Sequence, residues 1–242
     1  MVNKLATVAV IGLAISAICM GAAAAIGGKS LTNDLDLSFL GGFPRCESVA
    51  TATATSRDIP WDASNRVSLL VRGHAQYSPN NGDSLHVSGD PQTLAHLRLR
   101  DGSIEMDCNN FFGHGDHGNL EITLPGRAFN AFTVAGSGQL QLQNLNQNRL
   151  KMVIAGSGTI RAQGRVDKLE VHVAGSGDAD LGQVTSSIAE VHIAGSGDSD
   201  VAPSEDADNH LAGSGDVTLH SHPRAVERSI HGSGRIHEVS DG

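Results

Sequence analysis

The sequence predicts an all-β, single-domain parallel β-helix, a solenoid with coils of about 19 residues and Gly-Ser-Gly turns. The first observation is a repeat. The triplet Gly-Ser-Gly occurs six times, at residues 136–138, 156–158, 175–177, 195–197, 213–215 and 232–234. The second is its period, because successive copies are 20, 19, 20, 18 and 19 residues apart. The third is that apolar and polar residues alternate around the copies, which is the period of a β-strand.

The third copy shows this alternation most clearly. Leu169, Val171 and Val173 fall on one face of the expected strand, and Glu170 and His172 fall on the other. One strand–turn–strand unit cannot bury its apolar face alone. Stacking the units about 4.8 Å apart buries that face continuously and pairs each backbone with the coils on either side.

Glycine is expected at the turns because it adopts positive φ without steric cost. The predicted turn residues are Gly136, Gly138, Gly156, Gly158, Gly175, Gly177, Gly195, Gly197, Gly213, Gly215, Gly232 and Gly234. The six serines between them occur in equivalent positions, which indicates a turn requirement. They do not match the G-x-S-x-G motif of a serine nucleophile.

The regular coils occupy residues 131–242. Residues 46–130 also alternate like strands, but their repeat is degraded, so we interpret them as degenerate coils that cap the N-terminal end of the same domain, 46–242. Asp101-Gly102 is a tight-turn signal between two of these strands, and Ser88–Pro91 marks another turn.

The N-terminal segment is a targeting signal. Residues 5–26 contain no charged residue, and small residues accumulate at 22–25, so residues 1–26 are expected to be a signal peptide or an N-terminal membrane anchor. Residues 27–45 are then a tether. The chain is therefore expected to be exported to the periplasm or cell surface, with membrane contact only through the N-terminal segment if it is not cleaved.

Two cysteines remain beyond that segment, Cys46 and Cys108. In an oxidising compartment these two cysteines can pair as a disulfide. The alternative is that both are buried free thiols.

Composition excludes one class of partner. The chain has 26 acidic and 17 basic residues and a formal net charge of −9. Nucleic acid binding requires clustered Lys and Arg, so nucleic acid is not expected as a partner.

Two sets of outward side chains recur in the repeat. His172, His192 and His210 occupy one slot upstream of their triplets, and Asp178, Asp198 and Asp216 occupy the slot after them. Coils in register would stack each set about 4.8 Å apart, and a bound cation would relieve the repulsion between like charges. Imidazole with carboxylate suits zinc, and carboxylates alone suit calcium. The alternative is that the repeat copies solvated surface residues and no cofactor is bound.

A second cluster is His114, Asp116, His117 and Glu121, in a glycine-rich segment. It is a weaker metal candidate. Residues 113–118 of this segment also match G-x-G-x-x-G, but a strand pattern follows where a dinucleotide site needs a helix. No cofactor-binding site is therefore assigned there.

With these motifs in view, the chain resembles the head GIN domain family of auto-transporter adhesins over about residues 46–240. The resemblance depends on the degenerate strands around 67–107, the segment 120–125 that ends in Pro, and the six triplets. It implies an exported β-helix related in shape to pectin-lyase-like proteins, with a role in adhesion. The last coil departs from the pattern at Arg228, His231 and Glu238, which we interpret as a polar terminal cap.

The favoured function is a non-enzymatic, exported cell-envelope protein that presents a rigid β-helical surface to a glycan, a protein or another copy of itself. No catalytic residue is assigned. The alternatives are a carbohydrate-active β-helix enzyme of the polysaccharide lyase or hydrolase type, a metal-binding envelope protein, and a membrane-tethered domain that reads envelope stress. Trp61 and Tyr77 are more typical of core packing than of a sugar-stacking site.

Overall fold

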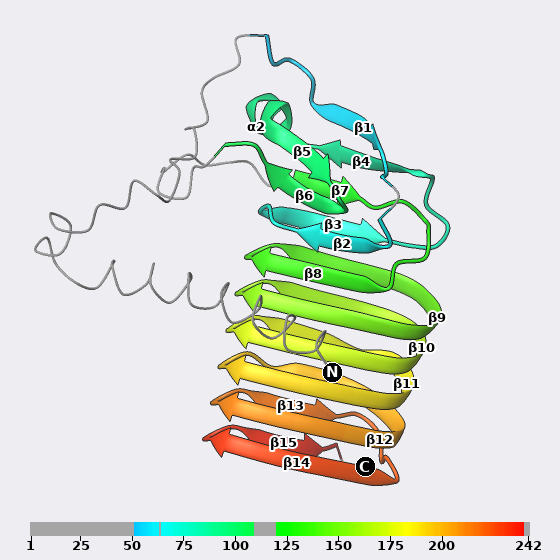
Figure 1. Cartoon of the computed structure of the whole chain (residues 1–242), viewed down its shortest axis with the longest axis vertical. Helices are drawn as coiled ribbons and strands as arrows, with labels where there is room; N and C mark the ends of the chain where they lie inside the picture. The colour runs from blue at the N-terminus through cyan, green and yellow to red at the C-terminus, as the bar shows by residue number, and fades with distance from the viewer. Residues whose placement is uncertain (1–50, 63, 109–119, 240–242) are drawn as a thin grey trace, which may run out of the picture. The chain divides into compact units, whose positions relative to one another are not determined.

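The computed structural model describes residues 51–62, 64–108 and 120–239. They form a parallel β-solenoid, as the repeat predicted (Figure 1). The regular coils consist of β8 (Ala131–Gly136), β9 (Gln139–Gly156), β10 (Thr159–Gly175), β11 (Asp178–Gly195), β12 (Ser199–Gly213), β13 (Asp216–Leu219), β14 (Ala225–Gly232) and β15 (Arg235–Glu238).

Each long strand from β9 to β12 bends around the core, so that its first and last parts lie in two different layers. The two halves of β12 show this division, because its first part pairs with β13 and its last part pairs with β14. In Figure 1, β14 lies in the front layer and β13 and β15 lie in the back layer. We call these the front layer and the back layer.

The coils stack in parallel and in register. One column of equivalent residues is Ala155, Ala174, Ala194 and Ala212, which pair in order from β9 to β12. Small irregularities occur only in the stretches between the two layers, for example between Arg161 and Gln163. Residues in equivalent slots of the repeat therefore lie directly above one another in both layers.

The N-terminal part differs from simple coils. Its elements are β1 (Ser56–Pro60), β2 (Arg66–Leu69), β3 (Gly73–Tyr77), β4 (Ser84–Ser88), α2 (Pro91–His96), β5 (Leu97–Arg100), β6 (Ser103–Met106) and β7 (Leu120–Thr123). Strands β2, β3, β6 and β7 continue the parallel stack, but β4 pairs antiparallel with β1 and β7, and β5 pairs antiparallel with β6.

Two local signals explain this departure. Asp101 and Gly102 both have positive φ, of 50° and 76°, and form the tight turn of the β5–β6 hairpin. The predicted turn at Ser88–Pro91 instead starts the short helix α2. Asp90 caps this helix by accepting a hydrogen bond from the Thr93 N–H, and Pro91 occupies its first turn.

The two glycines of each triplet have different roles. Only the first has positive φ, from 96° at Gly136 to 141° at Gly213. The second is needed for space: a Cβ on Gly197 would clash with the carbonyl oxygen of Gly177 and lie 2.7 Å from Cγ1 of Val173. The expectation that both glycines supply positive φ is therefore wrong for the second one.

Between the glycines, the backbone N–H of every triplet serine from Ser157 onward joins neighbouring coils. The serine N–H donates to the carbonyl oxygen of the first glycine one coil earlier, as from Ser176 to Gly156 at 2.9 Å and from Ser196 to Gly175 at 2.8 Å. The corner of the solenoid is therefore a continuous backbone hydrogen-bond ladder.

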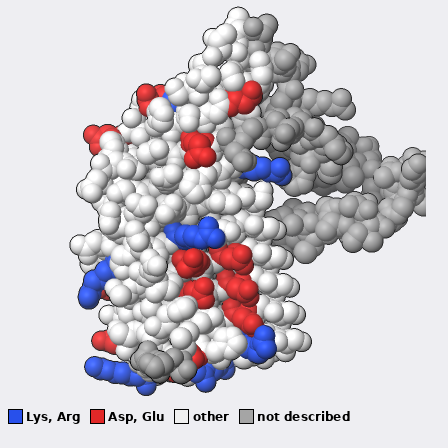
Figure 2. Space-filling model, turned by 180° about the vertical axis from the view of Figure 1, so that it is seen from behind, with Lys and Arg blue, Asp and Glu red and all other residues white. Residues whose placement is uncertain are grey.

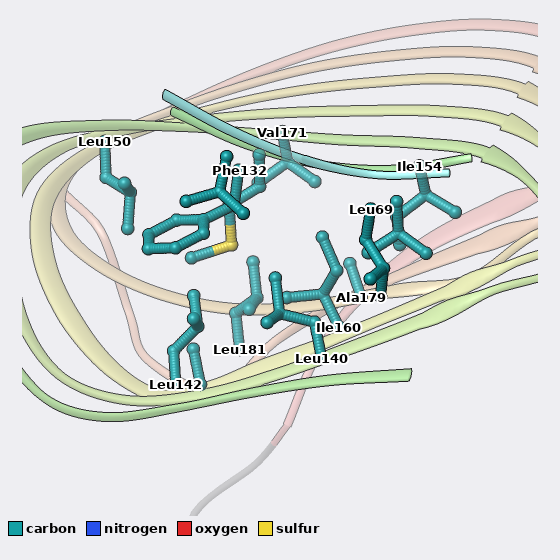
Figure 3. Packing of buried hydrophobic residues seen from close by; sticks show 14 of the residues in the cluster. Leu69, Phe132, Leu140, Leu142, Leu150, Ile154, Ile160, Val171, Ala179 and Leu181 are labelled. Atoms are coloured by element: carbon teal, nitrogen blue, oxygen red, sulfur yellow. The ribbon is translucent and has the colours of Figure 1, made fainter. Parts of the chain in front are cut away.

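The core lies between the two layers. Figure 3 shows Leu150, Phe132, Val171 and Ile154 facing Leu142, Leu181, Leu140 and Ile160 across it. At the N-terminal end, Phe129 packs edge-on against Trp61 and Tyr77, with ring centroids 5.2 and 5.8 Å apart. This aromatic cluster accounts for both residues as packing groups.

The C-terminal coil closes the core with charged groups. Arg228 pairs in register with the buried Asn209, and Glu238 pairs with the buried Leu219, so both take inward-facing slots. The Arg228 guanidinium donates to the Glu238 carboxylate, which joins the two layers over the end of the core. This ion pair is a polar terminal cap, as the last repeat suggested.

Substitution of Gly197 by Ala is expected to destabilise the protein by about 1–3 kcal/mol, because the added methyl group overpacks the backbone contact between coils. The measurement is thermal unfolding followed by circular dichroism. Gly82→Ala is the matched control, since a Cβ there meets no atom within 4 Å. Equal unfolding temperatures of the two variants would contradict this role for the second glycine.

Substitution of Asn209 by Val is expected to stabilise the protein by about 1 kcal/mol, because it removes a buried acceptor without a partner. Asn209 is 0% exposed, its Oδ1 accepts no hydrogen bond, and it continues the column of Val171 and Val191. The substitution also removes a hydrogen bond from Nδ2 to the Glu227 carbonyl oxygen, but this bond is long, at 3.3 Å. Chemical denaturation measures the change. The reverse substitution one coil earlier, Val191→Asn, should destabilise the protein. If both substitutions stabilise it, or if neither does, the column does not favour valine.

Candidate functional site

The outward side chains of the front layer form the candidate site. In each coil this layer alternates between the core and solvent, and the in-register stacking converts every outward slot into a column. Two adjacent columns carry ionisable groups at successive levels.

The first column is a histidine ladder of His172, His192 and His210. Neighbouring imidazole rings stack with centroids 4.9 Å apart at both steps, and their planes differ by 10° and 8°. The structure thus brings together the three histidines that the repeat singled out. Their side chains are 31–42% exposed, so one edge of each ring is open to solvent.

The second column consists of carboxylates that the sequence analysis missed. Glu170, Glu190 and Asp208 pair with one another in register and each lies two residues before a ladder histidine. The signal was present, because residues two apart on a strand point to the same face. Each carboxylate oxygen lies near the Nε2 atom of its own histidine, at 2.5, 3.1 and 3.1 Å in that order.

Lysines border the carboxylates at the N-terminal side. Lys151 occupies the slot before Glu170, forms an ion pair with it, and lies 3.1 Å from Nε2 of His172. Lys168 lies 3.2 Å from Oε2 of Glu190. We call the three histidines and three carboxylates together the imidazole–carboxylate ladder. The two lysines form ion pairs with its first two carboxylates, Glu170 and Glu190.

Burial and these partners shift the protonation of the ladder. Burial lowers the pKa of His172, and its hydrogen bond with Glu170 opposes that shift only in part. Burial by itself would raise the pKa of Glu170, but hydrogen bonds from Lys151 and His172 lower the pKa overall. The hydrogen bond with His192, helped by Lys168, lowers the pKa of Glu190. These shifts favour a neutral imidazole at His172 and ionised carboxylates at Glu170 and Glu190.

The predicted aspartate set lies elsewhere. Asp178, Asp198 and Asp216 are at the start of the coils, in the back layer, where Asp198 accepts a hydrogen bond from the Asp216 N–H at 2.8 Å. The Gly-Ser-Gly turn between histidine and aspartate carries the chain from one layer to the other. The histidines and these aspartates therefore do not form a common site.

A second aspartate column, Asp180 and Asp200, runs beside the first in the back layer. Figure 2 shows acidic side chains gathered on this face, with basic side chains at the margins of the cluster. Arg161 lies 3.5 Å from Asp180, and Arg235 donates to Asp216 at 3.1 Å, which lowers the pKa of that carboxyl group. These columns thus end on arginines.

Most of the remaining candidates lie outside the residues that the structure describes. His114, Asp116, His117 and Cys46 lie outside the described residues; Glu121 is exposed in β7. Cys108 is disulfide-bonded, and its pairing with Cys46 remains a prediction.

The ligand atoms of Cys108 lie within 4.8 Å of those of His96 and Asp107, a cluster that the sequence analysis did not identify. Asp107 is engaged there by His96 at 2.9 Å and by an ion pair with Arg98, and the disulfide removes the thiolate. Thiolate is the form of cysteine that binds metals, so this cluster is a structural contact.

Among the described residues, no helix is both long enough and apolar enough to cross a membrane. The N-terminal segment 5–26 lies outside them.

Comparison with known proteins agrees with the geometry. Residues 78–223 match the family model described as "putative auto-transporter adhesin, head GIN domain". No curated protein matches the chain.

Solved structures share its fold. A "putative adhesin" from Bacteroides fragilis aligns with a TM-score of 0.58 and 18% identity over 76% of this chain and 96% of that one. A "putative adhesin" from Parabacteroides distasonis aligns with a TM-score of 0.52 and 15% identity over 81% and 99%. At these identities the likeness establishes the β-solenoid fold.

The stability of the protein is expected to fall as the pH decreases from about 7.5 to about 5.5, because the lowered pKa of His172 means that the unfolded chain binds more protons in that range. Chemical denaturation at several pH values measures this. His172→Gln should flatten the change there and keep the further loss at lower pH, where Glu190 is protonated. Parallel pH profiles for the two proteins would contradict the assignment.

Proposed function

Since the chain belongs to the family of auto-transporter adhesin head GIN domains, we propose that it is a non-enzymatic binding module of the cell envelope, exported and held at the periplasm or cell surface. The family assignment supports a binding role and a surface location. The uncharged segment 5–26 supports export, either as a cleaved signal or as a retained anchor.

The observation that carries the proposal is the repetition of the imidazole–carboxylate ladder along a rigid face. His172, His192 and His210 present the same edge at 4.9 Å intervals, and each has a carboxylate beside it. Imidazole and carboxylate both form hydrogen bonds with hydroxyl groups. A polymer rich in hydroxyl groups, such as a glycan, would meet the same donors and acceptors at each level.

Rigidity favours binding by such a face. In the front layer, both sides of β10 and β11 are paired without a break, over Lys168–Gly175 and Ile188–Gly195, so their outward side chains are held on a fixed backbone. A preorganised surface loses less conformational entropy on binding than a flexible one.

The distribution of carboxylates supports a non-enzymatic role over the polysaccharide-cleaving alternative. Glycoside cleavage uses two carboxyl groups with different environments and different protonation states. In the ladder, Glu170 and Glu190 both have a lowered pKa and the same kind of partner at every level. This pattern fits repeated contacts better than one acid and one base.

The test is binding of the full chain to arrays of glycans and cell-envelope fractions, in the presence of a chelator so that metal ions do not contribute. We expect saturable binding to neutral glycans. The triple variant His172→Ala, His192→Ala, His210→Ala should weaken it at least about tenfold, the equivalent of about 1.4 kcal/mol.

The matched control is Asp198→Asn with Asp200→Asn, which changes the back layer and leaves the ladder intact. It should bind as the unsubstituted chain does. Loss of binding in the control but not in the triple variant would place the binding face on the back layer, and failure to bind any glycan or envelope fraction would contradict the proposal.

A further inference from the structure

We propose that the later half of the ladder, His192 and His210 with Glu190 and Asp208, is a binding site for a divalent transition-metal ion, with Zn²⁺ as the ion that its ligands suit best. This goes beyond glycan binding and is tested without any glycan, so that either proposal can fail alone.

The donor set comes from two neighbouring coils. Glu190 and His192 of β11 pair in register with Asp208 and His210 of β12. Two imidazole nitrogens and two carboxylate oxygens make four ligands, the number and types that Zn²⁺ takes in tetrahedral sites. Ca²⁺ instead takes six to eight oxygen ligands, so this set does not suit it.

An unpaired acceptor marks the site. Oδ1 of Asp208 is shielded from solvent, although 41% of the side chain as a whole is exposed, and it accepts no well-formed hydrogen bond from Nε2 of His210, which lies 3.1 Å away. A buried carboxylate oxygen without a partner is costly, and a cation would compensate it. The metal ion would also neutralise the two stacked carboxylates, Glu190 and Asp208, which carry two negative charges between them.

Lys151 prevents metal binding at the first level of the ladder, where Glu170 and His172 lie. Its ammonium group pairs with Glu170 and lies 3.1 Å from Nε2 of His172, so a cation at this level would meet a positive charge and lose both ligands. Lys168 acts differently at the next level. It contacts Oε2 of Glu190, while Oε1 faces His192 at 3.1 Å and remains available.

Zinc binding requires the side chains to move closer, because no three of these four residues have ligand atoms that all lie within 4.8 Å of one another. Zinc–nitrogen bonds of about 2.0–2.1 Å in a tetrahedron place two nitrogens about 3.4 Å apart. The two rings are stacked at 4.9 Å, and tilting them toward each other brings the Nε2 atoms closer. The oxygen–nitrogen separations of 3.1 Å within each pair are already near the edge length of such a tetrahedron. On binding, the ring hydrogen resides on Nδ1 and Nε2 faces the metal.

The test is a calorimetric titration of the full chain, without a histidine tag and freed of metal with a chelator, with Zn²⁺ alone. We expect one saturable site per chain. His210→Ala and Asp208→Asn should each weaken zinc binding at least tenfold. Circular dichroism of the variants checks that they are folded.

The matched control is His220→Ala, which removes another histidine paired with an aspartate, 3.3 Å from Asp200 in the back layer. It should bind zinc like the unsubstituted chain. Replacement of Zn²⁺ by Co²⁺ gives an independent readout, because tetrahedral Co²⁺ absorbs strongly in visible light. The proposal is overturned if the unsubstituted chain binds no zinc, if folded His210→Ala binds it unchanged, or if only His220→Ala loses it.

Discussion

The close backbone contact at the Gly-Ser-Gly corners is the constraint on which the rest of the structure depends. From the second triplet onward, the serine N–H donates to the first glycine's carbonyl oxygen in the coil before it, and the second glycine leaves no room for a side chain at Gly177, Gly197 or Gly215. A shift of one residue would flip every side chain between core and solvent. Because the corners admit glycine alone, they hold the long strands in one register, and the layers on both sides follow.

Because the coils stack in register, equivalent residues of the repeat form columns of like side chains. Carboxylates within a column repel one another, and the two layers offset this repulsion with different partners. In the back layer, the aspartate columns end on Arg161 and Arg235. In the front layer, each of the carboxylates Glu170, Glu190 and Asp208 has a histidine beside it on its own strand. The imidazole rings stack face to face between coils, and each carboxylate has the Nε2 atom of its own histidine within 3.1 Å.

The sequence predicted the solenoid and its turn glycines well because both follow from the repeat itself. Alternation placed Val171 in the core and His172 outside, and the period placed His172, His192 and His210 in one column. It could not assign layers, because a Gly-Ser-Gly triplet shows that the chain turns but not that the turn leads to the opposite layer, and the second bend, within each long strand, has no sequence marker. That is why the aspartates were expected near the histidines and Glu170 was overlooked. The N-terminal antiparallel pairs were missed for a related reason, because an alternating pattern does not show whether a strand pairs parallel or antiparallel. Helix α2 was missed because only local signals, such as the cap at Asp90, distinguish it from a turn.

The position of the ladder along the solenoid links its stability to its binding. In a repeat protein each coil is held mainly by its two neighbours, so the last coil, which has one, opens most readily. The core also becomes more polar toward that end, where Ser199 and Asn209 are buried with unpaired oxygens. Coils β11 and β12 lie just inside this end, next to the charged cap of Arg228 and Glu238. A ligand that contacts His192 and His210 together joins two coils that local opening would separate. Its binding energy then adds to the stability of the C-terminal end, in the way that any ligand of the folded state does.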